Sequence, residues 1–529
     1  MRCDIAVIGG GHNGLVAAAY LARAGLRTVV LERRHLLGGA CVTEELWPGY
    51  RVSRAAYVAG LLRPSLVREL NLGARGLELL PRDPSSYTPL PDGPGLLLGS
   101  DAAANQRAIA HFSRRDAARY PDYEAFLDRV AAALEPALDA APPDPARLRP
   151  GDLPLLARLG LGAWRLRDDL ARALRLLLAP ARSSLEEWFE SEPLRGTLAT
   201  DAVIGAWASP STPGTGYVLF HHVMGDTGGA RGVWAYVKGG MGALSEAVAA
   251  AAREAGAELR IDAPVERILL EDGRAAGVLL EDGTEIAARA VVSSADPHRT
   301  LLGLVERGAL DDEHVAALEA LDFRSPSVKV NLALDALPRF AGASGTAPAP
   351  EHRGTIHVGA CTLDELDAAF QAAERGLLPE RPMVELTLPS AVDDTLAPPG
   401  RYVASMFVQY APWQPAGSDW DAERDAFADR CIAMVEEVAP GFAQSVLERE
   451  VLAPPDLERI FGLTGGNIFH GAMGLDRLLF MRPLPGFARY RTPVPGLWLC
   501  GAGTHPGGGV MGACGRNAAR EILKDLRRA

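Results

Sequence analysis

The alternation of apolar and polar positions predicts a strand, a turn, a helix and a second strand within the first 32 residues. Ile5–Ile8 is a short apolar run of the kind that forms a buried parallel strand. An alanine-rich, helix-prone stretch follows at 15–24, and residues 28–31 are again mostly apolar. Strand, helix and strand in this order are typical of an α/β fold with a parallel sheet.

The pattern then changes to long amphipathic stretches. Apolar residues recur at helical spacing over 103–112 and 120–138, before a proline-rich break. Leu153–Leu178 is rich in leucine and arginine. We interpret it as a helical region that covers a substrate cavity, and a helix lying on a membrane surface is the alternative.

A second strand-forming unit lies between residues 236 and 297. A glycine turn at 239–242 precedes a predicted helix at 243–255, and Asp-Gly pairs mark two hairpin turns after it. A further apolar strand begins at Val291 and stops before Pro297. We expect this unit to return to the sheet of the first 32 residues. Its other predicted strands are 258–261, 265–270, 275–280 and 285–288.

Residues 300–480 alternate strands and helices, which predicts an α+β substrate domain. The C-terminal segment repeats the strand, glycine turn and helix of the first residues. The apolar run Leu497–Cys500 leads into a glycine-dense loop and a helix at 516–528. The main predicted elements of 300–480 are strands at 328–334, 384–388 and 402–409, and helices at 311–321, 365–374 and 420–438.

The first turn carries candidate chemistry. Gly9, Gly11 and Gly14 supply G-x-G-x-x-G, in which glycines allow a tight bend, close approach to a pyrophosphate and close packing of helix on strand. Glu32 ends the second strand, where a carboxylate can accept hydrogen bonds from ribose hydroxyls. The stretch therefore predicts a dinucleotide site for a cofactor with an unphosphorylated adenosine ribose.

Two further glycine-rich stretches extend this picture. Gly38 and Gly39 follow the acid directly and would let a second backbone segment approach the cofactor. Residues 501–515 contain seven glycines, which is costly in chain entropy. We expect an anion or a ring to pack against bare backbone there.

Composition narrows the classes of function. The 529 residues correspond to about two to four domains by length, and a net charge of −12 argues against a nucleic-acid binder. No apolar run of about 18 residues is present, so we expect no spanning helix. A strand beginning near residue 4 leaves no room for a secretory signal. We therefore expect a cytoplasmic protein, with peripheral membrane contact left open.

The six cysteines are scattered, which fits a reducing compartment and excludes a cysteine-rich zinc site, and we expect no metal. Flavin disulfide reductases carry C-x-x-x-x-C near Cys41, but the second position here is Leu46. We therefore expect Cys41 to be a small buried residue without a redox partner.

Taken together, segments 4–40, 236–297 and 497–520 look like three parts of one flavin site. The chain resembles the FAD-dependent superfamily of amine oxidases and phytoene desaturases, and within it the phytoene-dehydrogenase-like oxidoreductases. The motifs that carry this resemblance are Gly-Gly-Gly-His-Asn-Gly at 9–14, Lys-Gly-Gly-Met-Gly-Ala-Leu-Ser at 238–245, Gly-Gly-Asn-Ile-Phe-His-Gly at 465–471 and Leu-Cys-Gly-Ala-Gly-Thr-His-Pro-Gly-Gly-Gly at 499–509.

The resemblance implies an α/β fold with a discontinuous Rossmann-like FAD-binding domain, an inserted α+β substrate domain and a helical cap. The FAD-binding domain would comprise 1–100, 236–300 and 486–529. Residues 101–235 would form the cap and the start of the substrate domain, which would continue over 301–485.

The resemblance also implies the residues that hold FAD. Gly9, Gly11 and Gly14 would bind the pyrophosphate, and Glu32 the adenosine ribose. The further cofactor-binding residues that it implies are Arg33, Gly38, Gly39, Ala40, Val265, Gly501, Gly503, Gly509, Met511 and Gly512.

Two residues are candidates for a catalytic role. Lys329 lies in a predicted strand and could hold a water or tune the flavin, or it could be a solvated lysine at a strand edge. His505 lies in the C-terminal glycine loop and could donate to the ring or order the turn.

These features predict an FAD-dependent oxidoreductase that removes a hydride from a C–H bond of a largely apolar small molecule and passes it to flavin N5. An aromatic cage would favour an amine oxidase instead, and a long apolar tunnel beside Leu153–Leu178 would favour a desaturase of polyenes. The remaining alternative is a binding or regulatory protein that keeps FAD without efficient turnover. The electron acceptor, oxygen or a quinone, is left open.

Overall fold

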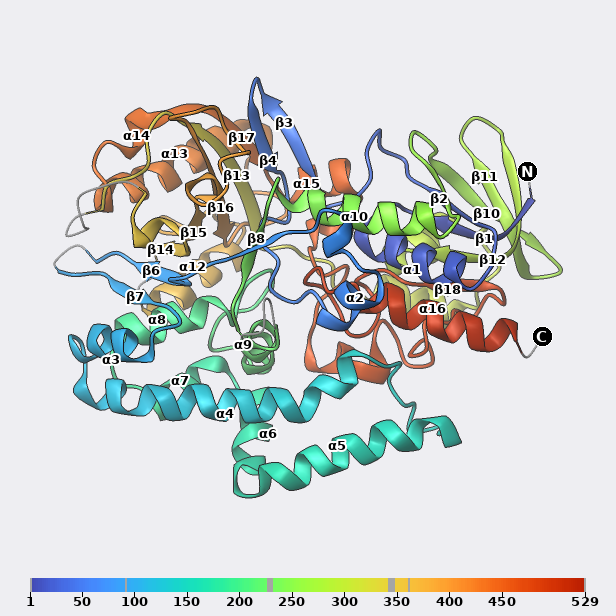
Figure 1. Cartoon of the computed structure of the whole chain (residues 1–529), viewed down its shortest axis with the longest axis horizontal. Helices are drawn as coiled ribbons and strands as arrows, with labels where there is room; N and C mark the ends of the chain where they lie inside the picture. The colour runs from blue at the N-terminus through green and yellow to red at the C-terminus, as the bar shows by residue number, and fades with distance from the viewer. Residues whose placement is uncertain (1, 91–92, 226–231, 341–347, 360–361, 528–529) are drawn as a thin grey trace.

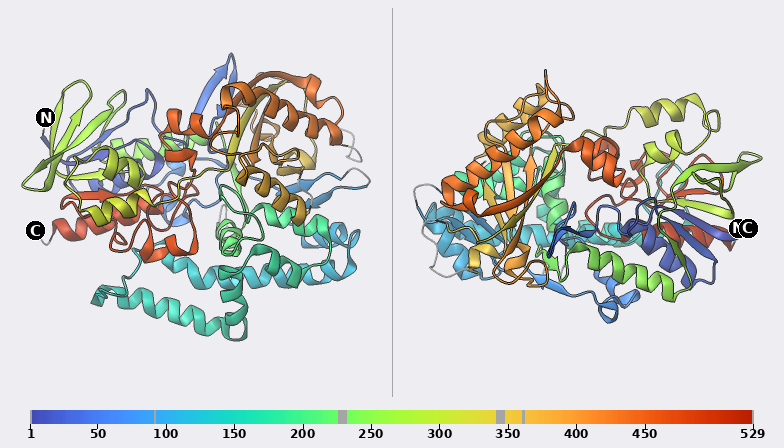
Figure 2. Two further views of the ribbon diagram at one scale, coloured as in Figure 1. Left: turned by 180° about the vertical axis from the view of Figure 1, so that it is seen from behind. Right: turned by 90° about the horizontal axis from the view of Figure 1, so that it is seen from above.

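The computed structural model describes residues 2–90, 93–225, 232–340, 348–359 and 362–527. Two large sheets lie side by side, and a layer of helices runs along one edge of the molecule (Figure 1). Seen from above, the sheets belong to two lobes that meet along a narrow middle region (Figure 2). None of the described helices combines the length with the apolar run that a membrane crossing requires.

The first sheet has the order β10-β11-β12-β1-β2-β9, with β18 beside β12. Its centre is β1 (Arg2–Ile8), which pairs in parallel with β2 (Thr28–Leu31) and β12 (Glu285–Ser293). The two strands expected around 285–294 are therefore one strand, which pairs with β11 near its start and with β18 near its end. The other strands are β9 (Glu258–Arg260), β10 (Val265–Glu271), β11 (Arg274–Leu280) and β18 (Leu497–Leu499).

Three helices share one apolar cluster on this sheet: α1 (His12–Arg23), α10 (Met241–Glu254) and α16 (Ala513–Leu526). A Cβ at Gly515 would lie 2.1 Å from the Asn13 carbonyl oxygen, so α16 can approach the backbone of α1 only with a glycine there. The other face packs on a second cluster that includes residues of α11 (Asp312–Glu319). Segments far apart in the sequence thus complete one layer.

The second sheet has the order β17-β13-β16-β15-β14-β6-β7. Its last two strands come from the hairpin at 86–98, where β6 pairs with β14. This differs from the expected boundary at residue 100, because the hairpin leaves the nucleotide-binding segment before Ser86. The strands are β6 (Ser86–Thr88), β7 (Leu96–Leu98), β13 (Ser327–Leu334), β14 (Thr355–Val358), β15 (Met383–Thr387), β16 (Tyr402–Gln409) and β17 (Val446–Leu452).

The helical cap lies along the lower edge of Figure 1. The stretch Leu153–Leu178 forms two helices joined by a short 3₁₀ turn. The cap helices are α3 (Ala102–Ala110), α4 (Arg114–Leu138), α5 (Leu153–Leu166), α6 (Leu170–Leu178), α7 (Ala181–Trp188), α8 (Glu192–Thr200) and α9 (Thr215–Val223). The remaining elements are the hairpin β3 (Thr43–Trp47) and β4 (Tyr50–Ser53), the pair β5 (Leu79–Pro81) and β8 (Ala235–Val237), and helices α2 (Pro64–Glu69), α12 (Leu363–Glu374), α13 (Trp420–Val438), α14 (Phe442–Ser445) and α15 (Pro454–Phe461).

Candidate functional site

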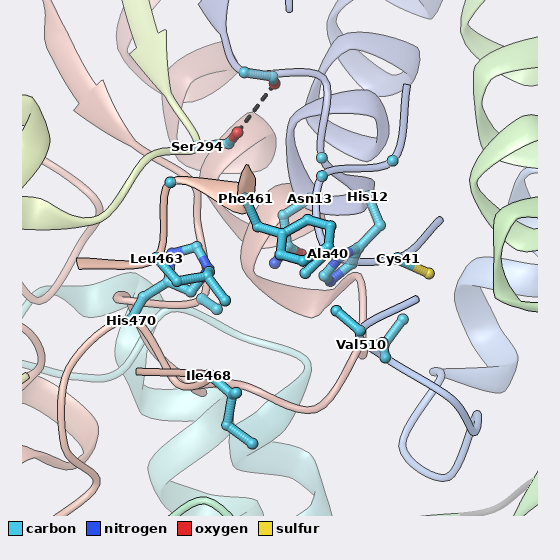
Figure 3. Close-up of a pocket in the computed structure, with 18 of the residues that line it drawn as sticks. His12, Asn13, Ala40, Cys41, Ser294, Phe461, Leu463, Ile468, His470 and Val510 are labelled. Carbon is cyan, nitrogen blue, oxygen red and sulfur yellow. Dashed lines mark hydrogen bonds between the residues drawn. The ribbon is translucent and has the colours of Figure 1, made fainter. Parts of the chain in front are cut away.

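A cavity of about 430 Å³ runs from the glycine turn after β1 to the face of the second sheet. Its walls come from both lobes, from α9 of the cap and from the loop after α15. Figure 3 shows residues that line it, with His12 and Ala40 on one side and Leu463, Ile468 and His470 on the other.

The nucleotide end of the cavity is made largely of main chain. The Gly38 amide donates to the Gly10 carbonyl at 2.8 Å, and Gly11 and Gly38 form a parallel bridge, so two backbone segments lie against each other. A Cβ at Gly14 would lie 2.2 Å from the Gly9 carbonyl oxygen. The same carbonyl accepts a hydrogen bond from Ser294 Oγ at 3.0 Å (Figure 3). This turn therefore requires glycine and holds α1 close to the end of β12.

Glu32 lies where β2 ends and is 5% exposed, at the wall of the cavity. Its carboxylate accepts from the Gly10 amide at 2.7 Å and from the Arg34 amide at 2.9 Å. These bonds fix the carboxylate next to the glycine turn and leave further lone pairs for a ribose. The adjacent Arg33 donates to the carbonyls of Arg459 and Ile460 and thus holds the C-terminal end of α15 against this lobe.

Unpartnered buried nitrogen atoms support a polar ligand at this end. His12 Nε2, His470 Nδ1 and Arg299 Nε are buried without a hydrogen-bond partner among the described residues, and all three residues line the cavity. Burial lowers the pKa of His12 to about 4, so its imidazole is neutral. Together with the glycine cradle, these groups fit the phosphates and hydroxyls of a dinucleotide.

The predicted cofactor residues divide into two groups. One group lines the cavity: Gly9, Gly11, Glu32, Arg33, Gly38, Gly39, Ala40, Val265 and Gly509. The other lies behind its wall: Gly14, Gly501, Gly503, Met511 and Gly512.

The C-terminal loop owes most of its glycines to packing within the protein. A Cβ at Gly501 would lie 2.3 Å from the Ser294 carbonyl oxygen, and one at Gly503 would lie 2.6 Å from the Pro297 ring. His505 also lies outside the cavity, where its Nε2 donates to the Ala137 carbonyl at 2.8 Å. Of this loop, Ala502, Gly509 and Val510 line the cavity, and Gly509 is the one glycine among them.

Lys329 marks the opposite end of the cavity. It lies on β13, between β16 and β17, and is 2% exposed, so the alternative of a solvated lysine at a strand edge is wrong. Its Nζ donates to Asn331 Oδ1 at 2.7 Å, contacts Ser405 Oγ and lies 5.2 Å from the centre of the Tyr57 ring. Burial lowers the pKa of Lys329 from 10.5 to about 7.

Tyr57 connects this end to a second titratable group. Its hydroxyl donates to Glu385 Oε2 at 2.8 Å. Burial and the charge of Asp201 raise the pKa of Glu385 from 4.5 to about 7. The Tyr57 ring stacks on Phe407 with centroids 5.9 Å apart, so the two rings form a single aromatic wall with no space between them for a substrate.

Several lining residues were missed at the sequence level. Ile204, His222, Trp234 and Phe407 come from the cap, from the loop after it and from β16. The adjacent histidines at 221–222 are the sequence feature that could have pointed to this part of the wall. Both side chains are buried, and His222 Nδ1 donates to the Asp201 carbonyl at 2.8 Å. No residue of 153–178 lines the cavity, so the expectation that these helices cover it is wrong, and α9 takes that place.

No cysteine among the described residues has a redox partner, and Cys361 lies outside those residues. Cys41 is buried, with Sγ 3.4 Å from the Met241 carbonyl oxygen, and burial raises the pKa of its thiol to about 12. No group of three or more metal-ligating side chains is found within the described ranges.

Comparisons with known proteins agree with this geometry. The family model for flavin-containing amine oxidoreductases matches residues 167–523, and the model for an NAD(P)-binding Rossmann-like domain matches residues 7–64. Pyridine nucleotide-disulfide oxidoreductase domain-containing protein 2 of Mus musculus is 49% identical, over 99% of this chain and 94% of the relative.

Two further matches are more distant. A phytoene desaturase (lycopene-forming) of Pseudescherichia vulneris is 27% identical, over 98% of this chain and 99% of its own. The crystal structure of an oxidoreductase from Methanosarcina mazei superposes with a TM-score of 0.62 at 16% identity and covers 99% of this chain and 100% of that chain. The structural match supports the fold.

Proposed function

This chain belongs to the family of flavin-containing amine oxidoreductases and is an FAD-dependent oxidoreductase, and from this premise we propose that it oxidises a C–H bond of a largely apolar small molecule. The observation that carries the proposal is the apolar wall beyond the glycine turn. That wall is lined by Leu61, Ile204, Trp234, Phe407, Ile468, Phe469 and Val510.

We propose that the nucleotide end holds the cofactor. Gly9, Gly11 and Gly38 would face the pyrophosphate, and Glu32 the adenosine ribose. Arg33 would contribute to cofactor binding indirectly, because it holds the end of α15 and thereby positions Phe461, which lines the cavity. When bound, FAD supplies the hydride acceptor.

The chain's own contribution at the reacting end is positioning and exclusion of water. Apolar side chains hold an apolar substrate and exclude water from most of this end of the cavity. Lys329 presents a buried amine whose pKa of about 7 leaves it largely neutral in mildly alkaline solution. In that form it can accept a proton from, or hold, a single water molecule at the wall.

An amine substrate is the second candidate, because the matching family model is that of amine oxidoreductases. The aromatic arrangement disfavours it. Tyr57 and Phe407 stack on each other instead of facing each other across a gap, so they form no cage for an amine. The relative named phytoene desaturase supports the apolar substrate proposed above. Oxygen or a quinone would then serve as the electron acceptor.

The test is the absorbance spectrum of the purified protein, followed by anaerobic mixing with polyenes, amines and NAD(P)H in turn. We expect a flavin spectrum that bleaches with a polyene or a related alkene and not with amines. Bleaching by amines alone would replace the proposal with amine oxidation. A bound flavin that none of these compounds reduces would favour a binding or regulatory protein.

A further inference from the structure

The outer surface of the cap carries an unusual set of exposed apolar side chains. Of the thirteen large apolar residues that are exposed in the described chain, eight lie between residues 148 and 178. Leu153 is 64% exposed and Trp164 is 61% exposed. We call residues 148–178 the arm. Its exposed apolar residues are Leu148, Leu153, Leu156, Leu161, Trp164, Leu170, Leu174 and Leu178.

The arm is firmly attached, so its exposure does not come from a loose segment. Asp152 pairs with Arg489 at 2.6 Å before α5 begins, and Asp169 pairs with Arg129 of α4 at 2.7 Å after it ends. Between these points Gly162 packs on α4, where a Cβ would lie 2.9 Å from the Ala133 carbonyl oxygen. The inner stripe of α5 is therefore already used for packing.

The exposed residues form a second stripe on the opposite side of α5. Leu153, Leu156 and Leu161 recur with Trp164 at helical spacing, and α5 lies along the outer edge of the molecule, away from both sheets (Figure 1). A soluble helix that already buries one apolar stripe gains nothing from a second unless another surface covers it.

The charge of the arm identifies that surface. Residues 148–178 contain six arginines and three aspartates, whereas the whole protein has a net charge of −12. Arg158 and Arg165 share one border of the exposed stripe and form no ion pair with any described residue. Arg167 lies over the Trp164 ring at 4.8 Å. Apolar residues bordered by arginines are typical of a helix that lies in the interface of an anionic membrane.

We propose that the arm is a docking surface for an anionic lipid bilayer. The apolar stripe of α5 would enter the headgroup region, and the bordering arginines would contact lipid phosphates. A second copy of the chain is a poorer occupant, because pairing two arms would bring their unpaired arginines together.

The experiment is flotation of the flavin-loaded protein with vesicles of phosphatidylcholine, with and without added phosphatidylglycerol. We expect binding to the anionic vesicles, much weaker binding to phosphatidylcholine alone and release by added salt. Leu161→Gln combined with Trp164→Gln should lower the partition coefficient at least about tenfold. Arg158→Glu combined with Arg165→Glu should also lower it about tenfold or more.

The matched control is Trp413→Gln combined with Leu447→Gln, which removes an exposed tryptophan and an exposed leucine outside the arm. It should bind anionic vesicles like the unmodified protein. Flavin absorbance checks that each variant is folded, and the binding readout is independent of any turnover. Lack of flotation with anionic vesicles, or an equal loss in the control, would overturn the proposal. So would self-association in sedimentation velocity that disappears with the arm variants.

Discussion

The two ends of the cavity are built from different parts of the polypeptide. At the nucleotide end, main-chain atoms of Gly9, Gly11 and Gly38 form the wall, and a Cβ at Gly38 would lie only 2.4 Å from the Cys41 carbonyl oxygen. At the far end, the side chains of Lys329 and Tyr57 form it, and their strands and loops come from distant parts of the sequence. In the function proposed above, the first end selects the cofactor and the second end selects the substrate.

The largest expected effect is at the nucleotide end. Gly14→Ala places a Cβ 2.2 Å from the Gly9 carbonyl oxygen, so α1 must move away from the turn. We expect loss of bound flavin, measured as the ratio of flavin to protein absorbance after purification. Gly73→Ala is the control, because no atom lies within 4 Å of the added Cβ. Normal flavin content in Gly14→Ala would show that side chains, and not main chain, build this end.

Lys329→Met tests the far end. The substitution keeps the length of the side chain and removes the amine, so we expect kcat to fall about 100-fold with flavin content unchanged. Because the pKa of Lys329 is about 7, kcat of the unmodified enzyme should rise as the pH increases through 7, and this rise should be absent from the variant. Lys238→Met, at an exposed lysine, should behave like the unmodified enzyme. An unchanged pH profile in Lys329→Met would assign the rise to another group.

Glu385→Gln removes the titratable carboxyl and keeps an acceptor for the Tyr57 hydroxyl. It therefore tests how much stability is lost when the buried carboxyl ionises. The folded-state pKa of about 7 lies above the ordinary value of 4.5, so the carboxyl stabilises the fold below pH 4.5 and this contribution is lost as the pH rises through 7. Glutamine can still accept from Tyr57. Relative to the unmodified protein, the variant should therefore gain about 3 kcal/mol in unfolding free energy between pH 4 and pH 8. Denaturant titrations at both pH values measure this gain, and parallel stabilities would contradict it.

The smallest expected effect is at Cys41, which lies at the nucleotide end without acting there. Burial raises the pKa of its thiol to about 12, and its Sγ lies 3.4 Å from the Met241 carbonyl oxygen. Cys41→Ala should leave flavin content and turnover unchanged and cost about 1 kcal/mol of stability. Thermal unfolding measures the stability and steady-state rates measure the turnover. A loss of turnover would show that the thiol takes part in the reaction.

The nucleotide end could be predicted because its signals are local. The apolar run before Gly9, the acid at position 32 and the later return at 285–293 each follow from spacing alone, and the family that they suggested is confirmed. The C-terminal glycines were harder to interpret, because a glycine required by packing against Ser294 has the same sequence signature as one required by a ligand.

The far end could not be predicted, because its neighbours meet only in the folded sheet. Lys329 was recognised in a strand, but its burial follows from the pairing of β13 with both β16 and β17. The bond from Tyr57 to Glu385 joins residues 328 positions apart. The segment boundary expected at residue 100 falls after the hairpin β6–β7, because its partner β14 lies far along the chain.

The dependence of the cavity on its last segment has a consequence for biosynthesis. β18 adds to β12, and Ala502, Gly509 and Val510 of the loop after it line the cavity. At roughly 5–20 residues per second, a ribosome exposes the first glycine turn long before this segment is made. A nascent chain that ends before Leu497 therefore lacks both β18 and this part of the cavity wall. Flavin loading should be a late, post-translational event, and flavin supply in the cell should limit the amount of protein that reaches its final form.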